Sequence, residues 1–114
     1  MTGQHIPDAI RLGQQVRQRR AALDLTAFTL AQLADVDLTT VNDIETGCPA
    51  TKQKTAHVIT ALGCTPTDDG ITPVLTEHTT KAIAVAVNRL KGDRHTTAVR
   101  WYRTAVRARC ADPR

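Results

Sequence analysis

LTAFTLAQLADVDLTTVNDIETG, residues 25–47, is the stretch that decides the fold of this 114-residue chain. Its apolar residues recur every three to four positions in two short runs, which is the spacing of one buried helix face. Thr26 is placed to cap a helix that ends near Ala34. Asp37 is placed to cap another helix that ends near Thr46, and Gly47 then supplies a C-cap. The stretch therefore predicts two amphipathic helices joined by a tight turn.

The spacing of these helices is that of a helix-turn-helix, an arrangement that mainly holds its second helix in the major groove of DNA. The stretch resembles the Cro/repressor family, also called the xenobiotic-response-element or lambda-repressor-like type. The family's opening and closing patterns appear as Leu25, Thr26, Leu30 and Ala31, and as Val41, Ile44, Glu45 and Gly47. The resemblance extends from Ala9 to Pro66, through a first helix with Leu12, Gly13, Val16 and Arg20 and a fourth helix over Thr51 to Leu62.

The resemblance implies an all-α, lambda-repressor-like bundle of four to five helices over residues 1–66. We expect residues 67–114 to add a linker and a basic helical hairpin, which is a two-helix C-terminal extension. The family also commonly pairs an arginine of the first helix with the glutamate at the end of the third. The resemblance therefore implies a structural ion pair between Arg20 and Glu45.

The third helix departs from the family on the side that would face DNA. The third helix, from Leu38 to about Thr46, contains no basic residue. At the start of the preceding helix, Ala27 stands where the family commonly has a glutamine that bonds a phosphate. The side chains of the third helix can nevertheless read base edges, since Asn42 can pair with adenine and Asp43 can accept from cytosine. The predicted base-reading residues are Leu38, Thr39, Thr40, Asn42 and Asp43.

Positive charge for phosphate contacts lies outside the third helix. Residues 1–66 hold six Lys or Arg against six Asp or Glu, so residues 67–114 carry the whole formal net charge of +4. Contacts to phosphates dominate the affinity of proteins for DNA. The predicted phosphate-binding residues are Arg17 and Arg19 on the first helix, Lys52 and Lys54 on the fourth, and Arg100, Arg103 and Arg107 near the C-terminus.

The C-terminal third is predicted to contain two helices after a linker. The linker covers Cys64 to Pro73, where two prolines, two aspartates and a glycine disfavour regular structure. A largely buried helix is expected from about Thr79 to Leu90, with an apolar stripe of Ile83, Val87 and Leu90 widened by Ala82 and Ala86. A strand is the alternative, because Ile83, Val85 and Val87 also alternate.

The last helix, from about Arg94 to Arg109, is amphipathic. Its apolar side is expected to pack on the body of the protein through Ala98, Trp101, Tyr102, Ala105 and Val106. The arginines at 100, 103 and 107 are expected on the opposite side. Three roles stay open for them: solvation alone, contact with DNA phosphates, or contact with an acidic protein partner.

Three apolar residues fall where the family usually exposes polar side chains: Phe28, Leu33 and Leu38. We expect some of them to dock the C-terminal helices and Leu38 to face DNA. A dimer interface or partner-binding surface is the alternative.

Other classes of site find little support in the sequence. Cys48, Cys64 and Cys110 are odd in number and lack a Cys-x-x-Cys spacing, so reduced thiols in a cytoplasmic protein are expected. Zinc is disfavoured, because Cys48, His57 and Cys64 have no nearby fourth ligand. There is no glycine-rich phosphate loop or nucleophile elbow and no apolar run near ~18 residues. No metal, cofactor, small-molecule ligand, enzymatic activity or membrane span is predicted.

Two binding functions remain. The first is a sequence-specific DNA-binding transcriptional regulator, a repressor of bacterial or phage type with double-stranded DNA as its partner. The second is a protein-interaction module, such as an antitoxin or an adaptor, that reuses the fold. The oligomeric state also stays open: a homodimer predicts a palindromic site, whereas a monomer that uses the third helix and the basic tail predicts an asymmetric one.

Overall fold

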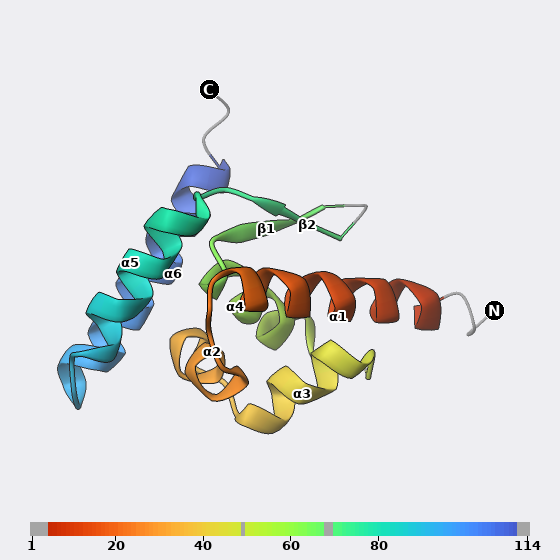
Figure 1. Cartoon of the computed structure of the whole chain (residues 1–114), viewed down its shortest axis with the longest axis horizontal. Coiled ribbons are helices and arrows are strands. Elements are labelled where there is room, and N and C mark those ends of the chain that lie inside the picture. The colour runs from red at the N-terminus through yellow and green to blue at the C-terminus, as the bar shows by residue number, and fades with distance from the viewer. Residues whose placement is uncertain (1–4, 49, 68–69, 112–114) are drawn as a thin grey trace.

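The structure is a computed structural model that describes residues 5–48, 50–67 and 70–111. This part of the chain forms a mostly helical molecule with one small hairpin, consistent with an all-α class (Figure 1). The elements are α1 (His5–Ala22), α2 (Ala27–Ala34), α3 (Leu38–Thr46), α4 (Lys52–Ala61), β1 (Cys64–Thr67), β2 (Gly70–Pro73), α5 (Glu77–Asn88) and α6 (Asp93–Ala111).

Helices α2 and α3 have the predicted bounds, and the turn between them has the backbone that the sequence favours. The Thr26 hydroxyl accepts a hydrogen bond from the Thr29 N–H at 3.0 Å, as expected of an N-cap. Asp35 adopts a left-handed conformation with φ of 59°, which aspartate tolerates better than most residues. Asp37 is the N-cap residue of α3, as predicted, but its side chain makes no capping hydrogen bond, so that part of the prediction is wrong. Gly47 closes α3 with φ of 87°.

The core lies among α1, α2, α3 and α4. Val16, Leu30, Leu33, Val41 and Leu62 are fully buried in it. Helix α1 lies alongside α3 and packs closely on it (Figure 1). The close approach needs a glycine, because a Cβ at Gly13 would collide with the carbonyl oxygens of Ile44 and Glu45.

The predicted linker is instead an antiparallel hairpin, with Cys64 paired to Pro73 and Thr67 paired to Gly70. Asp68 and Asp69, which contributed to the prediction, lie outside the described residues. Both strands are edge strands, where proline is tolerated, and Thr65, Ile71 and Thr72 favour extended backbone. The hairpin is attached to α1, because the Ile71 N–H donates to Gln15 Oε1 at 3.0 Å.

Helix α5 is a helix rather than the alternative strand, but its buried face is narrower than predicted. Thr80, Ala84 and Val87 are buried, whereas Ala82 and Ala86 are exposed. Helix α5 lies at the edge of the molecule, where it contacts α6 and α2 (Figure 1). A helix at an edge buries one stripe only.

Helix α6 buries a face that is rotated from the predicted one. Val99, Tyr102 and Val106 are buried at i, i+3 and i+7, and the Tyr102 hydroxyl donates to the Ala61 carbonyl at 3.1 Å. Trp101 is 65% exposed, so the prediction that it packs on the body is wrong. The arginines do not share an opposite side either, because Arg103 follows Val99 by four positions and its side chain is only 12% exposed.

The three apolar residues singled out in the sequence have different environments. Leu33 is fully buried in the core. Phe28 and Leu38 are exposed, Phe28 beside the turn between α5 and α6 and Leu38 at the start of α3.

Candidate nucleic-acid interface

One side of α3 is exposed and carries polar side chains. Thr39, Asn42 and Thr46 are exposed along it, Asp43 is half-buried beside them, and Leu38 is exposed at its beginning. Thr40 is 8% exposed, so the prediction that it reads bases is corrected: it faces a shallow groove between α3 and α4. Thr46 was not predicted, although it lies four positions after Asn42 on the same face. Its hydroxyl bonds the Asn42 carbonyl at 2.9 Å.

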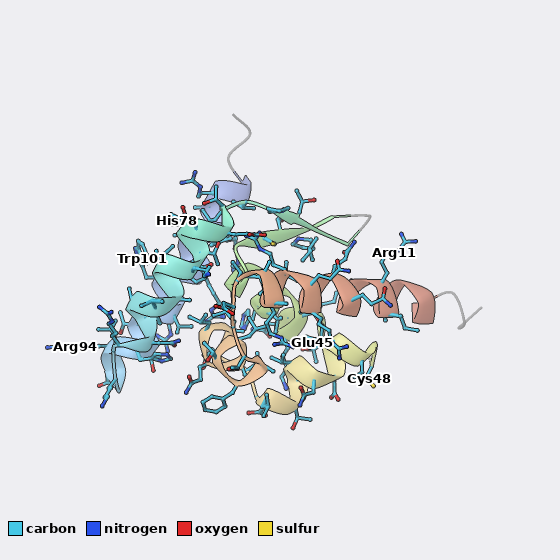
Figure 2. The ribbon with its side chains drawn as sticks, in the orientation of Figure 1. Arg11, Glu45, Cys48, His78, Arg94 and Trp101 are labelled. Atoms are coloured by element: carbon cyan, nitrogen blue, oxygen red, sulfur yellow. The ribbon has the colours of Figure 1, made fainter. Side chains whose placement is uncertain are left out.

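Helix α3 is held against α1 by a bidentate ion pair. Arg20 Nε lies 2.6 Å from Glu45 Oε2, and Arg20 Nη2 lies 3.0 Å from Glu45 Oε1. The Glu45 side chain is almost fully buried, and Figure 2 shows it between the two helices. The hydrogen bond with Glu45 raises the pKa of Arg20 above its ordinary value, against the opposing effect of burial. The pair that the resemblance implied is therefore present and fixes the orientation of α3.

Basic side chains flank α3 on both sides. Arg17, on α1, is 62% exposed, and its Nε lies 3.5 Å from Glu45 Oε1. Lys54, on α4, is exposed and lines the shallow groove with Asp43, Thr40, Ala50 and Thr51. Lys52 is exposed at the first position of α4. The predicted phosphate-binding residues Arg17 and Lys54 thus lie beside α3, Arg17 on the α1 side and Lys54 on the α4 side.

Arg19 has a structural role, which corrects its predicted contact with phosphate. Its Nε donates to the Leu62 carbonyl at 3.1 Å, and its Nη2 donates to the Leu75 carbonyl at 2.8 Å. Its Nη1 lies 3.9 Å from the Glu77 carboxylate. The guanidinium therefore joins α1 to the end of α4 and the start of α5, and the Arg19 side chain is largely buried there.

The arginines of α6 lie apart from this surface. The helix packs mainly on α4 and α5, and Figure 1 shows the α5–α6 pair at the side of the four-helix body. Arg100 and Arg107 are exposed, whereas Arg103 Nη2 lies 3.9 Å from Asp35 Oδ2 at the α2–α3 turn. The predicted arginine row is therefore split among different surroundings.

Two further classes of site are absent from residues 5–48, 50–67 and 70–111. Within these ranges no three His, Cys, Asp or Glu side chains lie together as metal ligands. The helices described there are also too short or too polar to cross a bilayer.

No known protein family, curated protein or solved structure matches the chain.

Proposed function

We propose that this chain is a sequence-specific DNA-binding transcriptional regulator, a repressor of the bacterial or phage type, with a lambda-repressor-like helix-turn-helix formed by α2 and α3. One observation carries the proposal: the exposed polar side of α3 is braced by the Arg20–Glu45 pair and flanked by Arg17 and Lys54. A rigid polar helix between cations matches a base-reading helix between two phosphate strands.

In this proposal α3 lies in the major groove. Asn42 supplies an amide that pairs with adenine, Asp43 accepts from cytosine, and Thr39 and Thr46 face the groove. Leu38 meets a thymine methyl group. Arg17, Lys52 and Lys54 contact phosphates and set the position of the helix.

The acidic residues near α3 limit the non-specific part of the binding. Asp37 and Asp43 bring negative charge close to the duplex, while α3 itself carries no basic residue and relies on cations such as Arg17 and Lys54 from its neighbours. Repulsion weakens contact with any phosphate backbone, whereas base contacts are gained only at the right sequence. We therefore expect weak binding to random DNA and a large ratio of specific to non-specific affinity.

A second candidate function is supported by the exposed aromatic residues. Phe28 and Trp101 are exposed although the chain has only three aromatic side chains, and aromatic residues are enriched in protein interfaces. In that case the chain is a protein-interaction module, such as an antitoxin or adaptor.

Selection of bound fragments from a random DNA library, repeated at two salt concentrations, tests the proposed function. Recovery of a motif supports a regulator, and a palindromic motif would indicate a homodimer. No enrichment even at low salt would contradict DNA binding and favour the interaction module.

A further inference from the structure

A group of charged side chains lies where α6, α4 and the α2–α3 turn meet. Arg103 comes from α6, His57 from α4 and Asp35 from the turn, and Arg107 follows Arg103 by one helical turn. None of these residues belongs to the exposed side of α3. The proposed contact of α3 with DNA therefore does not explain why these charged side chains lie together.

Arg103 is poorly paired for a side chain that is 12% exposed. In the described part of the chain its acidic partner is Asp35, whose Oδ2 lies 3.9 Å from Arg103 Nη2 and whose side chain is mostly exposed. Among the described residues nothing accepts a hydrogen bond from Arg103 Nε, which is buried. Burying a guanidinium without full hydrogen bonding is costly. An anion that accepts hydrogen bonds from the Arg103 guanidinium at shorter distances than Asp35 does would therefore stabilise this arginine.

The positive charges at this junction act on one another. Burial is the largest cause that lowers the pKa of His57, and the charges of Arg103 and Arg107 lower it further. The negative charge of Asp35 acts in the opposite direction and raises this pKa. One exposed carboxylate, that of Asp35, thus stands against the two guanidiniums of Arg103 and Arg107, while the lowered pKa keeps His57 largely neutral near pH 7. The excess is positive.

We propose that this junction binds a phosphate group, with the guanidiniums of Arg103 and Arg107 as donors and His57 beside them. Arginine is suited to this role, because its planar fork matches two phosphate oxygens at once. The phosphate binds Arg103 in place of its long contact with Asp35. Phosphate groups of this kind occur in a DNA strand and in phosphorylated small molecules. The site does not depend on α3, so it goes beyond the proposed function.

The first experiment uses inorganic phosphate and the full-length protein. NMR titration of the histidines is carried out in phosphate and in chloride at equal ionic strength. Bound phosphate raises the pKa of His57 saturably, because a nearby anion favours imidazolium. His78, which Figure 2 shows on α5, serves as the internal reference and does not respond. No phosphate-specific change at His57, or an equal change at both histidines, would overturn the proposal.

Substitutions assign the response to the junction. Arg107→Gln removes an exposed charge and is expected to weaken phosphate binding about tenfold without disturbing packing. Arg103→Gln is expected to abolish the response. Arg94→Gln is the matched control, because Arg94 lies near the start of the same helix and points away from the body (Figure 2). Equal loss in the Arg94 and Arg107 variants would contradict the site.

A second set of titrations distinguishes the two sources of the phosphate. A short random-sequence duplex that shifts His57 and competes with inorganic phosphate would identify a DNA strand as the ligand. A response to phosphate that the duplex neither reproduces nor competes with would identify a small phosphorylated ligand. If fragment selection recovers no DNA, the proposed regulator fails, while the inorganic phosphate titration still decides this site.

Discussion

Asn42 is the exposed side chain of α3 whose amide can both donate to and accept from one base. It lies between Thr39 and Thr46 on a helix that the Arg20–Glu45 pair holds in place. A base reader in this position acts on specificity rather than on general affinity.

We therefore expect Asn42→Ala to weaken binding to the selected site by about 1–3 kcal/mol and to leave binding to random DNA nearly unchanged. Titration of both DNAs by fluorescence anisotropy measures the two effects. Equal losses on the two DNAs would remove Asn42 as a base reader.

Tyr102 is a buried residue whose hydroxyl pKa is raised by its burial. Burial raises the pKa of its hydroxyl to about 12, because the phenolate is poorly solvated beside the Ala61 carbonyl. The unfolded chain releases this proton near its ordinary pKa, so the folded state binds more protons between about pH 10 and 12. Stability is complete below that range and falls as the pH rises through it, by about 2–3 kcal/mol.

Tyr102→Phe should lose about 1 kcal/mol at neutral pH, because the Ala61 carbonyl loses its donor, and should lack the Tyr102-dependent fall at high pH. Urea unfolding of both proteins from pH 7 to 12 measures the difference. Parallel pH profiles would mean that Tyr102 is not responsible.

At the scale of elements, the close packing of α1 on α3 positions the candidate interface. It combines the buried ion pair with the close approach at Gly13. An alanine there would normally favour a helix by nearly 1 kcal/mol. Here the added Cβ meets the carbonyl oxygens of Ile44 and Glu45.

Gly13→Ala is therefore expected to destabilise the protein by about 1–3 kcal/mol, because the two backbones must move apart. Gln14→Ala, on the exposed side of the same helix, is the control. Thermal unfolding of both variants tests the prediction, which a stabilised Gly13→Ala protein would refute.

Helices α1 and α4 also place cations on either side of α3. The logarithm of the DNA-binding constant falls linearly with the logarithm of the salt concentration. Replacing both Arg17 and Lys54 with glutamine should reduce the magnitude of this slope by about 1.8, which is about 0.9 for each lost phosphate contact. Arg11→Gln provides the control, since Figure 2 shows Arg11 on the side of α1 away from α3. If the slope does not change in the double variant, the two residues are not phosphate contacts.

At the scale of the whole molecule, the α5–α6 pair covers one side of the body and leaves Trp101 exposed (Figures 1 and 2). Because Trp101 is the only tryptophan, its fluorescence reports on this face. We expect dilute protein to emit at the wavelength of a solvated indole and to be quenched readily by iodide. A blue shift with rising concentration would indicate a homodimer through this face. Blue-shifted, protected emission at every concentration would contradict the exposed position.

The local pattern of the sequence determined α2, the turn and α3, since caps, a left-handed turn residue and apolar spacing act within a few residues. The Arg20–Glu45 pair was implied by the resemblance, and the structure contains it. Other roles depended on neighbours that are distant in the chain. Arg19 binds carbonyls 43 and 56 residues away, and the β1–β2 hairpin is attached to α1 through Gln15.

The rotation of α6 was likewise decided only by tertiary structure. Its composition allows either Trp101 or Val99 to face inward. The surface offered by α4 selects Val99, Tyr102 and Val106, with the Tyr102 hydroxyl reaching Ala61. Periodicity determines that a helix has an apolar stripe. The shape and hydrogen-bonding groups of the surface on which the helix packs decide which part of a wide apolar stripe is buried. They also decide which neighbouring arginine side chain is buried with it.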